Sequence, residues 1–279
     1  MKSIPVHFTF RQYRILCVAA LLAVYTGLNP SLSGALEPVV SSASDTNAMA
    51  LASEALDAVN RRFDGLSTLQ YEVQRTTVSR GVTLEEHWSF AYAADGRLRI
   101  EYKKPEKRIF VFDGKVFTEY LPAVRQALQT DIGDGNPHGF ERMSAVLQRL
   151  SVDGLRIGNR DMLLSHFESA KRLDDQAAIL KVTGKDPAYT LLIDTQRQTL
   201  LRFEKYDGKG TLTLSIRVSD FQEPMPGFWF PTALQTLAEG ANGKSESTVA
   251  ISAIRLNAVI PDKIFKATLP PDVKVNTAN

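Results

Sequence analysis

The sequence has only one cysteine among its 279 residues, Cys17, and this residue lies in an apolar run near the N-terminus. A basic leader precedes the run and small residues follow it as far as Ala35, which is the three-part pattern of a secretory signal peptide. We therefore expect residues 1–35 to be a cleavable signal and the protein to be exported to the periplasm. The alternative is an uncleaved anchor, but the run is shorter than the roughly 20 residues of a spanning helix. Cleavage would remove Cys17 and leave the protein without disulfide or thiol chemistry.

An excess of charge of either sign is also absent. The chain has 33 basic and 31 acidic residues, and its formal net charge is +2. No basic stripe with interleaved aromatic residues occurs, so we expect no nucleic-acid partner. The hydrophobic content of 44% and the length are sufficient for a sizeable core.

The spacings of known catalytic and metal-binding motifs are missing as well. His87, His138 and His166 stand apart from one another, and no HExxH, GxSxG, GxxxxGK[ST] or GxGxxG pattern is present. The acidic stretch at 131–139 has the wrong spacing for an EF-hand and is typical of a polar loop. We therefore expect no catalytic residues, no metal and no cofactor. A hydrolase is the third class considered, and no motif supports it.

A helix is predicted near the start of the mature chain. Residues 36–47 are small and polar, which indicates a flexible tether. From Ala48, apolar residues recur at spacings of three and four, which predicts an amphipathic helix capped by Asn47 and ended by Gly65. Residues 48–279 are then expected to form a single domain.

Most of the remaining sequence alternates between apolar and polar residues, which is typical of strands. Hairpins are predicted at 85–102 and 108–120, the second with an Asp113-Gly114 turn, and further strands run from 178 to 257. Helical spacing is expected at 140–150 and, with less regularity, at 162–173. Because strands and helices do not alternate, a parallel sheet is not expected. One large antiparallel sheet must curl around its helices or close, and both solutions leave a concave apolar interior.

Aromatic residues are concentrated on one face of the predicted hairpins. They form an ordinary core or, in the functional interpretation, line a hydrophobic cavity for acyl chains. The candidate ligand-binding residues are Trp88, Phe90, Tyr92, Leu98, Ile100, Tyr102, Phe112, Phe117 and Trp229.

Five stretches together resemble the LolA/LolB-like superfamily of periplasmic lipoprotein carriers and their sorting-protein relatives. The likeness covers roughly residues 50–275, and each stretch alone is a weak signal. The stretches are FDGLSTLQYEVQ (63–74), GRLRIEYKKPEKRIFVFDGKVFTEYLP (96–122), LLIDTQRQTLLRFEKYDGKGTLTLSI (191–216), GFWFPTAL (227–234) and IPDKIFKATLPPDVKV (260–275).

The resemblance implies an α+β fold, in which a strongly curved, mostly antiparallel sheet (a half-barrel) wraps over a few helices. It also implies a monomeric, non-enzymatic protein that binds lipid or lipoprotein acyl chains in an apolar cavity. The alternative is a sensor or scaffold domain that binds a membrane-anchored partner protein, as a relative in envelope-stress signalling does. Ala94-Asp95 stands where the lipoprotein carrier has an Arg-Pro pair. We therefore expect a relative with another lipid or apolar ligand.

Overall fold

The computed structural model describes residues 43–132, 157, 160–173, 179–240 and 243–278. The predicted signal peptide, His138 and the helix expected at 140–150 lie outside these residues. The elements are α2 (Ala43–Arg61), β1 (Thr68–Ser79), β2 (Val82–Ala93), β3 (Leu98–Lys104), β4 (Arg108–Phe112), β5 (Val116–Leu121), η2 (Pro122–Val124), β6 (Gln126–Asp131), α4 (Arg160–Ser165), β7 (Phe167–Arg172), β8 (Ile179–Gly184), β9 (Tyr189–Asp194), β10 (Thr199–Tyr206), β11 (Leu212–Met225), β12 (Phe228–Gly240), β13 (Gly243–Leu256), η3 (Asp262–Phe265) and β14 (Lys274–Ala278).

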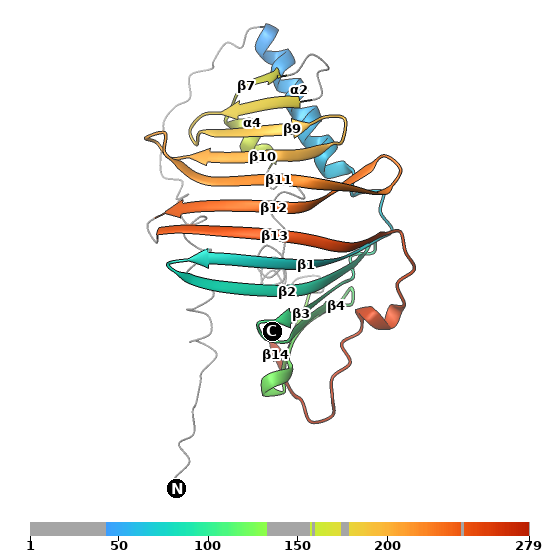
Figure 1. Cartoon of the computed structure of the whole chain (residues 1–279). Helices are drawn as coiled ribbons and strands as arrows, with labels where there is room; N and C mark the ends of the chain where they lie inside the picture. The colour runs from blue at the N-terminus through green and yellow to red at the C-terminus, as the bar shows by residue number, and fades with distance from the viewer. Residues whose placement is uncertain (1–42, 133–156, 158–159, 174–178, 241–242, 279) are drawn as a thin grey trace.

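All of these strands belong to one curved sheet (Figure 1). The sheet has 14 strands in the order β14-β6-β5-β4-β3-β2-β1-β13-β12-β11-β10-β9-β8-β7. Neighbouring strands are antiparallel except for β14, which pairs with β6 in parallel. The prediction of a curved, mostly antiparallel sheet over a few helices is therefore confirmed. The parallel strand β14 was not predicted.

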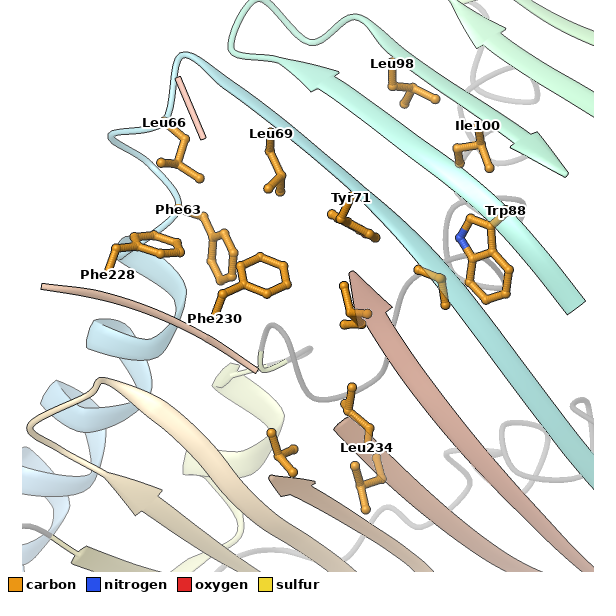
Figure 2. Packing of buried hydrophobic residues seen from close by; sticks show 14 of the residues in the cluster. Phe63, Leu66, Leu69, Tyr71, Trp88, Leu98, Ile100, Phe228, Phe230 and Leu234 are labelled. Atoms are coloured by element: carbon orange, nitrogen blue, oxygen red, sulfur yellow. The ribbon is translucent and has the colours of Figure 1, made fainter. Parts of the chain in front are cut away.

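The two faces of the sheet differ in what covers them. We call the side that carries Leu69, Tyr71 and Val73 of β1 the inner face, and the opposite side the outer face. The inner face carries the larger apolar core. Its buried side chains, here called the central cluster, are Phe63, Leu66, Leu69, Tyr71, Val73, Trp88, Leu98, Ile100, Tyr102, Ile216, Val218, Phe228, Phe230, Leu234 and Ile251 (Figure 2).

Helix α2 covers one end of the inner face, against β7 and β8. Ala52, Leu56 and Val59 recur at helical spacing and are fully buried against strands β8 and β9. A reciprocal pair of hydrogen bonds joins the Asn60 side chain to the backbone of Ile157, at 2.9 and 3.0 Å. Because α2 spans only this end, the central cluster extends well beyond the helix.

The C-terminal segment lies on the outer face. Phe265 is 1% exposed and packs against Ala91 and Ala93, the small residues on the outer side of β2. Phe265 therefore anchors this segment to the sheet. Beyond it the chain reaches the edge of the sheet and forms β14.

Two element boundaries differ from the predictions. Helix α2 begins at Ala43, within the stretch predicted as a tether, and so Asn47 lies inside the helix rather than capping it. Residues 162–173 were predicted to be a short helix or irregular cover, but α4 ends at Ser165 and β7 follows. The edge of β8 offers a full ladder of backbone hydrogen bonds to this segment, and pairing outweighs its weak helical spacing.

Candidate ligand-binding face

The predicted aromatic residues form a continuous ladder across strands β1 to β3 on the inner face. Trp88 of β2 lies opposite Val73 and Tyr102, and Phe90 lies opposite Tyr71 and Ile100. The ring centroids are 5.3 Å apart for Trp88 and Tyr102. Tyr71 and Phe90 stack at 4.8 Å. These distances are those of favourable aromatic pairs, so the ladder stabilises the sheet as well as forming an apolar surface.

The ladder continues toward the edge of the sheet. Tyr92 pairs with Leu98, which in turn lies opposite Phe112 on β4. Phe112 pairs with Phe117 of β5, and the Phe117 ring stacks on Phe110 at 6.3 Å. The structure thus brings eight of the nine predicted residues onto one face.

Trp229 is the exception. It lies between Phe228 and Phe230, which are both in the central cluster, and strand alternation directs its side chain to the other side. Its ring contacts the Arg197 guanidinium, whose Cζ lies 5.0 Å from the ring centroid. Trp229 therefore does not share the face of the other eight candidates, because neighbouring residues of a strand point to opposite sides of the sheet.

Several ladder residues are only partly buried. Phe90, Tyr92, Phe110 and Phe112 pack against the central cluster and retain exposed surface. Large aromatic side chains with accessible surface on a concave face are typical of sites that bind apolar ligands. The face can therefore offer contact area to a hydrocarbon chain, with no reactive group required.

A partly buried ion pair lies at one end of the ladder. Arg75 Nε donates to Glu86 Oε2 at 2.7 Å, and the two side chains are 17% and 13% exposed. The Arg75 guanidinium also lies over the Trp88 ring, 5.0 Å from its centroid. Neither Arg75 nor Glu86 was predicted as a site residue. Only the pairing register of β1 and β2 shows that the two side chains lie opposite each other.

Burial and hydrogen bonding alter the pKa values of two side chains on β1. Burial of Tyr71 in the central cluster raises the pKa of its phenol above the usual range. On the outer face, the pKa of Glu72 is lowered, chiefly by a hydrogen bond from Lys103 Nζ at 2.8 Å. His87 adds a second contact to Glu72 at 3.2 Å.

A separate cavity of about 410 Å³ lies on the outer face, under the C-terminal segment. Its lining includes Arg97, Thr118 and Phe265, and none of the nine predicted residues. Arg97 is held there by Asp95 at 2.7 Å and Asp262 at 2.9 Å. The ion pair between Arg97 and Asp262 therefore ties the C-terminal segment to the start of β3.

No group of three or more His, Cys, Asp or Glu side chains that could hold a metal occurs among the described residues. Asp194, a buried carboxylate, accepts hydrogen bonds from the backbone N–H groups of Gln196 and Arg197 and shapes the turn after β9. Within the same described residues, no helix has the length and apolar character needed to cross a membrane.

Comparison with known proteins shows similarity of structure without similarity of sequence. No protein-family model matches the chain, and no curated protein matches its sequence. A DUF1329 family protein from Desulfovibrio piger has a similar structure, with 16% identity, a TM-score of 0.50, and coverage of 78% of this chain and 97% of that one. This likeness shows a shared fold.

Two further solved structures are similar to the chain at lower TM-scores. The LolA superfamily protein NE2245 from Nitrosomonas europaea has 15% identity and a TM-score of 0.47 over 77% of this chain and 97% of its own. A putative outer membrane lipoprotein-sorting protein domain from Vibrio parahaemolyticus has 11% identity and a TM-score of 0.47, covering 79% and 96%. The superfamily that the sequence motifs resemble is thus among the structural neighbours found.

Proposed function

We propose that this protein is a non-enzymatic periplasmic carrier that binds the acyl chains of lipids or lipoproteins on the inner face of its sheet. The observation that carries the proposal is the aromatic ladder, whose partly exposed rings are Phe90, Tyr92, Phe110 and Phe112 and which extends beyond the part of the inner face that α2 covers. Burial of a hydrocarbon chain contributes about 0.8 kcal/mol per CH₂ group. A chain lying along this ladder would therefore be held without any reactive side chain.

The proposal is also supported by the signal-like N-terminal sequence. To test it, the protein would be expressed with its full N-terminus, purified from the periplasm and extracted for lipid analysis by mass spectrometry. We expect co-purified acyl lipids that a fluorescent fatty acid displaces. The absence of both lipid and fatty-acid binding would contradict the carrier function.

A second candidate function is a sensor or scaffold that binds a membrane-anchored protein. The observation that favours it is the open edge at β7, which pairs only with β8 among the described residues. An open edge can accept a strand from a partner. Cross-linking in cells from a reactive group placed at Ser169 would test it, since a stoichiometric protein adduct favours this function and its absence favours the carrier.

A further inference from the structure

The indole N–H of Trp88 is buried and has no hydrogen-bond acceptor in the part of the chain that the structure describes. Trp88 is 0% exposed, and its Nε1 lacks a partner among those residues. Buried donors in folded proteins are nearly always paired, because burial removes their hydrogen bonds to water. Trp88 therefore carries, inside the aromatic ladder, an N–H donor that no described residue satisfies.

Trp88 also lies at the boundary between the apolar and the polar part of the inner face. On β1, the inner side chains are Tyr71 and Val73 on one side of this boundary and Arg75 and Thr77 on the other. On β13, Ile251 and Val249 are followed in the same way by Ser247, which accepts a hydrogen bond from Thr77 at 3.3 Å. On β1 and β2 the inner side chains thus change from apolar to polar beside Trp88, whereas Leu234 and Ile216 continue the apolar core on β12 and β11.

The donor is aimed along this face. Figure 2 shows the indole nitrogen of Trp88 on the edge of the ring that faces Tyr71. The ring also stacks on Tyr102 and lies under the Arg75 guanidinium. Because this N–H is buried, an acceptor beside Tyr71 would meet it once the side chains that cover it move aside, with the polar side chains of β1 and β2 one residue pair further on.

We infer that Trp88 is a specificity-determining residue whose N–H donates a hydrogen bond to the carbonyl oxygen of an acyl ester in the bound ligand. This inference rests on the proposed carrier function. The acyl chain would lie over Tyr71 and Phe90, and the polar part of the ligand would lie toward Arg75 and Glu86. An acyl ester has its carbonyl oxygen where the hydrocarbon chain meets the polar part, which matches the position of Trp88 on this face.

The test compares two ligands that differ only in that oxygen: dodecanoyl lysophosphatidylcholine, an ester, and the dodecyl ether analogue. Affinities would be measured by calorimetry on the purified, delipidated full chain below the micelle concentration. One hydrogen bond to a neutral acceptor predicts that the ester binds about five- to tenfold more tightly than the ether. In Trp88→Phe, the two affinities should become equal, while Trp229→Phe, on the other face, should keep the ester preference.

The ratio of the two affinities distinguishes the loss of the donor from a general disruption of the site, because a disruption would lower the affinity for both ligands. If Trp88→Phe does not fold, replacement of Trp88 by benzothienylalanine removes the N–H and keeps the shape. Equal binding of ester and ether by the natural protein, or an ester preference that survives both replacements, would overturn the inference and leave the carrier function standing. Failure of both ligands to bind would contradict the carrier function itself.

Acyl esters occur in free glycerolipids and in lipidated proteins, and a diacylated cysteine peptide added as a third ligand distinguishes these sources. Tighter binding of this peptide than of the lysolipid, with the same dependence on Trp88, would support the carbonyl contact and identify lipoproteins as the source. Weaker binding with that dependence would support the contact for free lipids. Loss of the dependence on Trp88 for both ligands would count against the contact.

Discussion

The guanidinium of Arg75 lies 5.0 Å from the centre of the Trp88 ring while its Nε donates to Glu86. This contact joins the last aromatic side chain of the β2 ladder to the first charged pair of the inner face. On β1 and β2 the aromatic ladder therefore ends beside a charged pair, which would favour one orientation of a ligand that has a hydrocarbon chain and a polar group.

Loss of the Glu86 charge is expected to destabilise the protein. Glu86→Gln removes the charge that Arg75 pairs with at 2.7 Å in a largely buried setting, and we expect a loss of about 1–2 kcal/mol in the free energy of unfolding. The matched control is Glu246→Gln, which breaks the exposed pair with Lys244 at 2.6 Å and should cost less than about 0.5 kcal/mol. Urea unfolding of both variants checks this, and equal effects would show that the Arg75 pair is no more than a surface contact.

Gly184 is expected to tolerate no side chain. A Cβ atom at this position would lie 1.9 Å from Cε1 of the buried Tyr189 ring, so Gly184→Ala must displace the ring or bend β8. We expect a loss of about 2–4 kcal/mol in the free energy of unfolding. Gly240→Ala is the control, since it adds the same methyl group to a strand with no atom within 4 Å. A near-wild-type melting temperature for Gly184→Ala would mean that Tyr189 does not pack on Gly184.

The Glu72 carboxylate should titrate below the usual range of glutamate. The hydrogen bond from Lys103 is the main cause of its lowered pKa, with a smaller effect from His87 against the opposing effect of burial. Because the pKa is lower in the folded state than in the unfolded state, the carboxylate stabilises the protein above its unfolded pKa. That stabilisation is lost as the pH falls through the folded value.

The measurement is an NMR titration of the Glu72 side chain. Lys103→Gln should raise the midpoint toward that of ordinary glutamate, while Lys104→Gln, whose partner is Glu85 at 3.9 Å, should leave the midpoint unchanged. An unchanged midpoint in Lys103→Gln would disprove the assigned cause.

Ligand affinity should depend on the inner face and be insensitive to the outer one. Phe112→Ala removes a partly buried ring of the ladder, and we expect about a tenfold loss of affinity for a fluorescent fatty acid. Trp229→Ala removes an even larger ring, on the other side of β12, and this variant should bind the fatty acid as the wild type does. Titrations monitored by fluorescence would decide, and the reverse order of effects would place the ligand elsewhere.

Much of the fold could be predicted because the strands alternate regularly. The hairpins of β2–β3 and β4–β5 were correctly located, since alternation and the turn residues Gly96 and Gly114 indicate them independently. Both glycines have positive φ, at 91° and 102°, as tight turns of this kind require. Strand β14 escaped prediction because its five residues are mostly exposed and carry no alternation.

The candidate site was less predictable than the fold. Eight residues of the ladder were identified from their spacing within single strands. Arg75 and Glu86 were missed because their relation depends on which residues of two strands lie opposite each other. That the Trp88 N–H has no acceptor among the described residues could not be predicted, because it is a property of three-dimensional packing.

The central claim, that an acyl chain lies on the inner face, is tested most directly by quenching of tryptophan fluorescence. The chain has two tryptophans, and Trp229→Phe leaves Trp88 as the sole reporter. We predict that a fatty acid brominated along its chain quenches Trp88 on binding, that the unbrominated acid does not, and that Trp229 in Trp88→Phe is unaffected. Binding of the brominated acid without any loss of Trp88 emission would contradict the account.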